Sequence, residues 1–172
     1  MSDDAITLDQ VLALKHGGTG EVVNVDEEVT KLVVFTLGPD WFAFHGDNVR
    51  EILNDCPIFF LPGCPASLEG VINVRGDIES VVRLRSVLGY GDATKALGSK
   101  LLLGQAAGMR SAIRVDTVQE VLDVPQSGFQ SPPHTITDHL RGLVVGIVHF
   151  SDHIISVLDM NNLFEDYRAG LR

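Results

Sequence analysis

Short runs of apolar, β-branched and aromatic residues, separated by Gly, Pro and Asp, dominate the chain from residue 31 onward. Runs of this length and composition are typical of strands, and the interrupting residues are typical of turns. The clearest hairpins flank Gly38-Pro39-Asp40 and Arg75-Gly76-Asp77. The predicted strands are residues 32–37, 41–45, 47–53, 70–74, 78–84, 101–107, 116–122, 142–150 and 154–158. Residues 47–53 have the alternative of opening as one helical turn. Little helix is expected beyond a turn at 85–88 and a closing helix from about 161 to 167. The pattern therefore predicts an all-β protein.

The same pattern occurs twice. Residues 31–54 align without a gap on residues 100–123, and residues 70–88 align on residues 146–164. Matching charges accompany the matching apolar positions, because Asp47 and Glu51 align with Asp116 and Glu120. Such a repeat predicts two similar folding units related by a pseudo-twofold axis, with a seam between them.

The regions outside the repeat divide the chain. Residues 1–30 are expected to form a tail, in which Thr7 and Gln10 resemble a capping box before a short helix over about 8–15. A single domain is expected over 31–167, with a first subdomain over about 31–90 and a second over about 100–160. The terminal segments of these subdomains could be exchanged between the two units. Prolines make 57–66 irregular, and 126–139 is expected to be the longest loop.

Composition narrows the functional classes. The chain of 172 residues is 45% apolar and 21% charged, which is typical of a packed globular protein. A net charge of −10 disfavours nucleic acids and anionic membranes as partners. No apolar run is long enough to span a membrane, and the first residues do not resemble a signal peptide, so a cytoplasmic protein with free thiols at Cys56 and Cys64 is expected.

Catalytic and metal-binding patterns are missing from the sequence. It contains no nucleophile elbow, zinc-protease helix motif or phosphate-binding loop. His149 and His153 are predicted to lie on opposite sides of a turn, and Cys56 and Cys64 have no evident orienting group beyond His45. We therefore expect no catalytic residue, no metal site and no cofactor.

Residues 61–89 resemble the signature of the CheW-like domain family of bacterial chemotaxis. Residues 70–76 (GVINVRG) nearly reproduce the family's G-V-I-N-L-R-G stretch, and residues 49–52 are similar to its V-x-E-V element. Further similarity covers about 31–165, through residues 112–116, 118–121, 124–125 and 155–164. The resemblance implies two pseudo-symmetric five-stranded SH3-like β-barrels that share a core, with short helices at the termini.

The resemblance also implies a function. Members of this family are non-catalytic adaptors that couple the cytoplasmic tips of chemoreceptors (methyl-accepting chemotaxis proteins) to the histidine kinase CheA, whose regulatory domain shares the fold. One barrel packs against the kinase's matching barrel, and the receptor's helical hairpin docks in the groove between barrels. The expected location is the cytoplasm, with recruitment to membrane receptor arrays and no insertion into the membrane.

Four residues are expected at the receptor-binding surface by their match to the family motifs: Arg75, Glu51, Val49 and Gly70. A guanidinium at a strand end can hold the Glu51 carboxylate while it presents its remaining donors outward. The alternatives are an ordinary solvated ion pair worth under about 1 kcal/mol, core packing for Val49 and a close backbone approach for Gly70. The sequence assigns no kinase-binding residues.

Two departures from the family pattern bear on the partner. Ser80 stands where the family has proline, and Arg83 stands where it has aspartate. These changes leave open a divergent array that controls pili or development instead of flagella. A different alternative is a small-molecule sensor that binds in the seam between the barrels. In the second repeat Ser151-Asp152 replace Arg75-Gly76, and we expect function where the symmetry is broken in this way.

Overall fold

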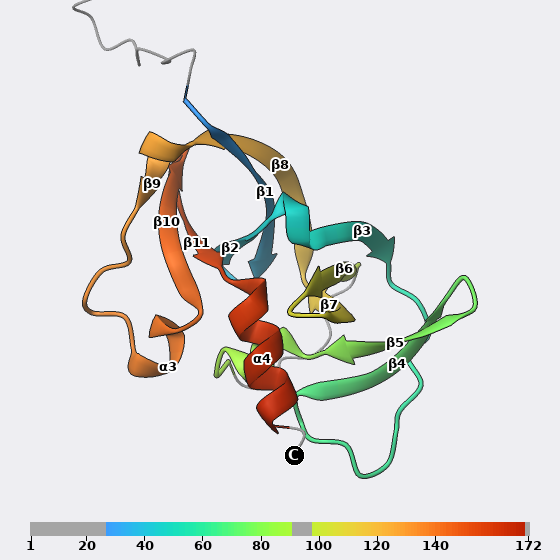
Figure 1. Ribbon diagram of the computed structural model, residues 1–172. Coiled ribbons are helices and arrows are strands. Elements are labelled where there is room, and N and C mark those ends of the chain that lie inside the picture. The colour runs from blue at the N-terminus through green and yellow to red at the C-terminus, as the bar shows by residue number, and fades with distance from the viewer. Residues whose placement is uncertain (1–26, 91–97, 171–172) are drawn as a thin grey trace, which may run out of the picture.

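A computed structural model describes residues 27–90 and 98–170 as two β-sheets with few helices (Figure 1), so the all-β prediction is confirmed. The helix predicted over about 8–15 lies outside the described residues. The first sheet contains, in spatial order, β8 (Thr117–Pro125), β1 (Val29–Leu37), β2 (Asp40–His45), β11 (His153–Leu158), β10 (Val144–Phe150) and β9 (Phe129–Gln130). The second sheet contains β3 (Val49–Asn54), β6 (Lys100–Ala106), β7 (Met109–Val115), β5 (Asp77–Val82) and β4 (Leu68–Val74). The helical elements are η1 (Gly46–Asn48), α2 (Leu84–Val87), η2 (Gln126–Gly128), α3 (Asp138–Arg141) and α4 (Met160–Gly170).

Each sheet combines strands of both repeats. The β1–β2 hairpin of the first repeat pairs with β8 and β11 of the second, antiparallel to β8 and parallel to β11. In the same way the β6–β7 hairpin of the second repeat pairs with β3 and β5 of the first. The two repeats are therefore intertwined, and neither sheet is formed by one continuous stretch of chain.

The first sheet has six strands where five were expected. The additional strand, β9, lies in the segment predicted as the longest loop, which also contains η2 and the start of α3. Phe129 and Gln130 pair with Val148 and Ile147 of β10, and the Phe129 side chain packs on a buried cluster inside the first sheet. The partly buried Phe129 side chain thus anchors a strand that is too short for a periodic signal.

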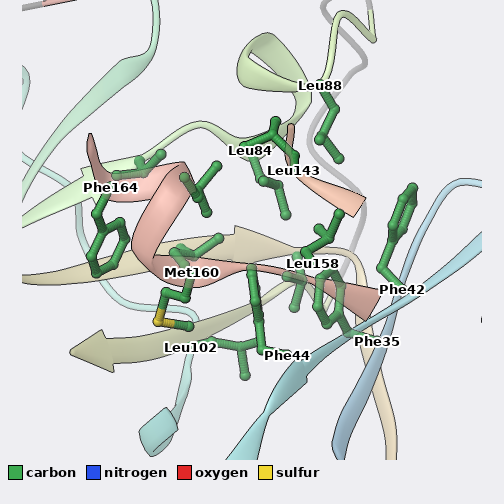
Figure 2. Close-up of a cluster of buried hydrophobic side chains, with 14 of the residues drawn as sticks. Phe35, Phe42, Phe44, Leu84, Leu88, Leu102, Leu143, Leu158, Met160 and Phe164 are labelled. Carbon is green, nitrogen blue, oxygen red and sulfur yellow. The ribbon is translucent and has the colours of Figure 1, made fainter. Parts of the chain in front are cut away.

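The largest core cluster lies between the two sheets (Figure 2). Phe35 and Phe44 from the first sheet stack with ring centroids 5.1 Å apart, and they share this cluster with Leu102 of the second sheet. Helix α4 contributes Met160 and Phe164, which are almost fully buried. Two smaller buried clusters lie one inside each sheet. Most of the buried apolar side chains therefore belong to a core that both repeats build together.

Gly104 explains how α4 reaches this core. In the repeat alignment Gly104 occupies the position of Phe35, so the second repeat lacks an aromatic ring where the first has one. A Cβ atom at Gly104 would lie 2.8 Å from Cε of Met160 and 3.3 Å from Cζ of Phe164. The missing side chain thus makes room for α4 against β6.

Polar contacts join each of the helices α2 and α4 to the hairpin turn of its own repeat. The Asp116 carboxylate accepts hydrogen bonds from the Gly38 backbone N–H at 2.6 Å and from Arg85 Nη2 at 2.7 Å. At the repeat-equivalent turn, the Ala107 N–H donates to Oδ1 of Asn161 at 2.9 Å. Asn161 aligns with Arg85 and Ala107 with Gly38, so the same junction is made twice with different side chains.

Candidate functional site

The β4–β5 turn, formed by Arg75 and Gly76, has an unusual backbone for its sequence. Both residues have positive φ angles, 51° and 92°, as in the two-residue hairpin turns that favour Asn or Gly. For an arginine, this left-handed conformation costs roughly 1–2 kcal/mol. The Asn73 side chain supports the turn, because its Oδ1 accepts a hydrogen bond from the Gly76 N–H at 2.8 Å. The surrounding turn therefore holds Arg75 in a conformation that it would not adopt on its own.

Arg75 forms an ion pair with Glu51. Its Nη2 donates to Oε1 of Glu51, as expected from the sequence. The Arg75 side chain is 74% exposed and the Glu51 side chain 31% exposed. An ion pair so open to solvent contributes under about 1 kcal/mol to stability. Its geometry matters more than its energy, because it connects β3 to the turn after β4, and these are the two outer strands of the second sheet.

A depression lies beside this ion pair, between β3 and β4. It is lined by Leu53, Asn54, Cys56, Asn73, Val74 and Arg75. Leu53, Cys56 and Val74 also pack against the buried cluster inside the second sheet. The surface around Arg75 thus combines a guanidinium with apolar side chains. Of these lining residues only Arg75 was expected at the site from the sequence, although the alternation of β3 places Leu53 on the same face as Glu51.

Val49 and Gly70 take no part in the Arg75–Glu51 ion pair. Val49 is half-buried and packs against the core between the sheets, just before a β-bulge that interrupts the β3–β6 register. Gly70 is buried, and the backbone of Phe59 passes directly over it. Phe59 and Val71 exchange two backbone hydrogen bonds of 2.8 and 2.9 Å at this point. The structure therefore brings Arg75 and Glu51 together and gives Val49 and Gly70 roles in packing.

The second repeat contains the corresponding turn without the ion pair. Ser151 has the same φ of 51° as Arg75, with which it aligns. Glu120 aligns with Glu51, but a serine at position 151 has no guanidinium to offer it. The hairpin conformation is thus compatible with a small polar residue, and the arginine is not needed to form the turn.

The two departures from the family pattern, Ser80 and Arg83, differ in the contacts that they make. Ser80 Oγ lies 2.7 Å from Ser111 Oγ on the neighbouring strand β7. Burial raises the pKa of Tyr167 in α4, while a hydrogen bond with the Ser80 side chain acts in the opposite direction. Ser80 therefore joins β5 to β7 and α4 where proline would offer no side-chain hydrogen bond. The structure shows the Arg83 N–H donating to the Ser67 carbonyl at 2.7 Å, a backbone contact that does not depend on the arginine side chain.

Among residues 27–90 and 98–170, no group of His, Cys, Asp or Glu side chains is arranged to hold a metal ion. Within the same ranges, no helix is long and apolar enough to cross a membrane.

Comparison with known proteins agrees with the fold. The family model of the CheW-like domain matches residues 31–168. The chain belongs to the CheW-like domain family. It is 29% identical over 144 residues to the chemotaxis protein CheW of Treponema pallidum, covering 81% of this chain and 85% of the relative. It is 26% identical over 145 residues to a probable chemotaxis protein CheW of Rhizobium etli, covering 84% and 94%.

The solved structures contain the same fold. The scaffolding protein TtCheW from Thermoanaerobacter tengcongensis matches with a TM-score of 0.73 and 30% sequence identity, covering 80% of this chain and 94% of that protein. Membership of the CheW-like domain family makes this chain a non-catalytic scaffold of the chemotaxis type.

Proposed function

We propose that this CheW-like protein couples the cytoplasmic tips of chemoreceptors to the regulatory domain of the histidine kinase CheA. The observation that carries the receptor half of this proposal is the Arg75 turn. Arg75 has a strained backbone, pairs with Glu51 and is exposed to solvent, and Asn73 stabilises its turn. The equivalent turn of the second repeat has Ser151 in the same conformation. Backbone strain of this kind persists where the surrounding structure imposes it, and it clusters at functional sites.

The ion pair and its depression suit the side of a helical hairpin. Glu51 fixes one edge of the guanidinium, which leaves the outward donors of Arg75 available to a carboxylate or carbonyl of the receptor. The apolar lining beside it can receive an aliphatic side chain from the same helix. Val49 and Gly70 would support this surface from below, Val49 by packing β3 on the core and Gly70 by letting β4 lie against the Phe59 backbone.

This function places the protein in the cytoplasm, recruited to receptor arrays at the membrane without inserting into it. The net charge of −10 is consistent with protein partners and disfavours direct contact with anionic lipid. The output that the array controls, whether flagella, pili or development, depends on the receptor and kinase.

Charge reversal tests the receptor site. Arg75→Glu should weaken binding to a receptor cytoplasmic fragment about tenfold or more, with the free energy of unfolding changed by less than about 1 kcal/mol. The double variant Arg75→Glu/Glu51→Arg restores an internal ion pair but should remain defective, because the outward donors are then on the wrong strand. Lys31→Glu is the matched control, since Lys31 is 65% exposed and pairs with Asp123 on the first sheet.

Two outcomes would contradict the receptor site. Wild-type affinity of Arg75→Glu for the receptor fragment would show that Arg75 is an ordinary solvated residue. Restored binding in the double variant would show that the pair acts only by bracing the second sheet. Failure of the unmodified chain to bind receptor or kinase would contradict the adaptor function itself.

A further inference from the structure

The segment between β3 and β4 exposes apolar side chains that the core does not need. Phe59 is 62% exposed, Phe60 73% and Leu61 40%. We call these three consecutive residues the Phe59–Leu61 edge. In Figure 1 the connection from β3 runs back along β4 before it enters that strand, and Phe59 pairs with Val71 in the middle of β4. The edge therefore borders the second sheet on its β4 side.

The repeat shows that the fold accepts polar residues here. Gln130 pairs with Ile147 in the second repeat as Phe59 pairs with Val71 in the first, and Ile147 aligns with Val71. The residues equivalent to Phe59, Phe60 and Leu61 are thus Gln130, Ser131 and Pro132. Two exposed phenylalanines at positions where the fold is satisfied by Gln and Ser indicate a surface that is covered by a partner.

The backbone of the edge narrows the class of partner. The N–H and C=O of Phe59 both bond to Val71, so the corresponding groups of Phe60 point away from β4. Among the residues that the structure describes, none pairs with the backbone of Phe60. Extended backbone can satisfy these groups, whereas a helix has already used its own donors and acceptors internally. A β-rich partner therefore suits the edge better than a helical hairpin.

Area and charge disfavour a second copy of this chain as the partner. The exposed parts of the three side chains amount to roughly 300 Å², against the roughly 800 Å² per partner that a stable interface buries. Each copy also carries a net charge of −10, which opposes self-association. An apolar patch of this size suits the centre of an interface whose remaining area comes from a larger, different protein.

We propose that the Phe59–Leu61 edge is the surface on which the regulatory domain of the kinase docks. This inference rests on the proposed function, in which the kinase domain is the β-barrel partner and the receptor is the helical one. The edge lies apart from the Arg75–Glu51 pair, because Val71 lies roughly 13 Å along β4 from Arg75. Gly70, which lies under the Phe59 backbone, would support both surfaces. Both partners could then bind the second sheet side by side.

The test compares binding of the full chain to full-length kinase and, separately, to a receptor cytoplasmic fragment. The double variant Phe59→Ser/Phe60→Ser should lose about 30-fold or more in kinase affinity and keep its receptor affinity within about twofold. Ile154→Ser is the control, because Ile154 is a similarly exposed apolar residue, at 58%, on the first sheet. It should leave both affinities unchanged.

Each other result overturns the inference. Wild-type kinase affinity of the double variant would show that the edge is not the kinase surface, while the proposed function stands. Loss of receptor binding alone would assign the edge to the receptor. Self-association in sedimentation that disappears in the double variant would assign it to a second copy. If the unmodified chain binds neither partner, the proposed function fails together with this inference.

Discussion

Gly70→Ala should destabilise the protein strongly, while Gly146→Ala at the repeat-equivalent position should not. A methyl group at Gly70 would overlap the carbonyl oxygen of Phe59 and lie 2.7 Å from Cγ2 of Ile58. At Gly146 the nearest atom would be the Gln130 carbonyl oxygen at 3.5 Å, an ordinary contact. The two variants thus change the same residue type at the same place in the fold, with very different room.

The expected magnitude follows from what must move. Backbone atoms cannot yield as a flexible side chain can, so the segment of Phe59 has to shift away from β4. Overpacking of this kind costs about 1–3 kcal/mol, and weakening the two Phe59–Val71 hydrogen bonds adds about 1 kcal/mol. We expect a loss of about 2–4 kcal/mol for Gly70→Ala and a change within about 1 kcal/mol for Gly146→Ala.

Urea unfolding measures both variants. Trp41 is the single tryptophan and stacks on His153 at a centroid distance of 3.9 Å, so its fluorescence reports loss of the first sheet. The loss at Gly70 corresponds to a Tm lower by roughly 5–15 °C. Equal stability of Gly70→Ala and the unmodified chain would refute the reasoning, as would equal destabilisation by both variants. The first result would mean that the Phe59 segment is not held against β4.

Two further predictions concern pH and the junction between the sheets. Burial and the hydrogen bond to Asp40 raise the pKa of Tyr90 to about 12, and burial also raises the pKa of Tyr167. The folded chain then holds these protons more tightly than the unfolded chain, whose tyrosines ionise near pH 10, so the contribution of the two tyrosines to stability should be constant below about pH 10 and fall toward pH 12. Ultraviolet titration should show tyrosinate forming well above pH 10, and absorbance rising at pH 10 in the folded state would contradict this. Asp116→Ala should cost about 2–3 kcal/mol in urea unfolding because it leaves the Gly38 N–H and Arg85 without their acceptor, whereas Lys31→Ala should cost at most about 0.5 kcal/mol. Equal effects of Asp116→Ala and Lys31→Ala would show that the junction is no stronger than a surface ion pair.

Alternation of apolar residues predicted most strands, but it could not predict which strands share a sheet. The repeat indicated two similar units, and each unit does supply the same succession of strands. The exchange of the β1–β2 and β6–β7 hairpins depends on contacts such as Trp41 with Ile155, which lie far apart in sequence. Side-chain periodicity specifies the buried face of a strand and carries no information about its neighbour. Strand β9 and helix α3 are too short for any periodic signal.

The Arg75–Glu51 pair came from the resemblance to a family motif and not from spacing. Asn73 and the Phe59–Leu61 edge were not predicted, for different reasons. The role of Asn73 depends on the position of one N–H in a two-residue turn. Exposed phenylalanines look like core residues in a sequence, so only the structure distinguishes Phe59 and Phe60 from the buried Phe35.

Because the repeat places two residues at equivalent positions of the fold, the residue in one repeat shows what the fold requires of the residue in the other. At the β-turn, Arg75 and Ser151 share one backbone conformation, and along the outer strand Phe59 and Gln130 occupy one pairing position. In each comparison the fold is satisfied by the polar residue of the second repeat. The costlier residue, a strained arginine or an exposed aromatic, lies on the second sheet both times. Because folding does not require either residue, partner binding is the remaining physical reason for both. We therefore expect the binding surfaces to be concentrated on the second sheet, with the first sheet acting mainly as its support.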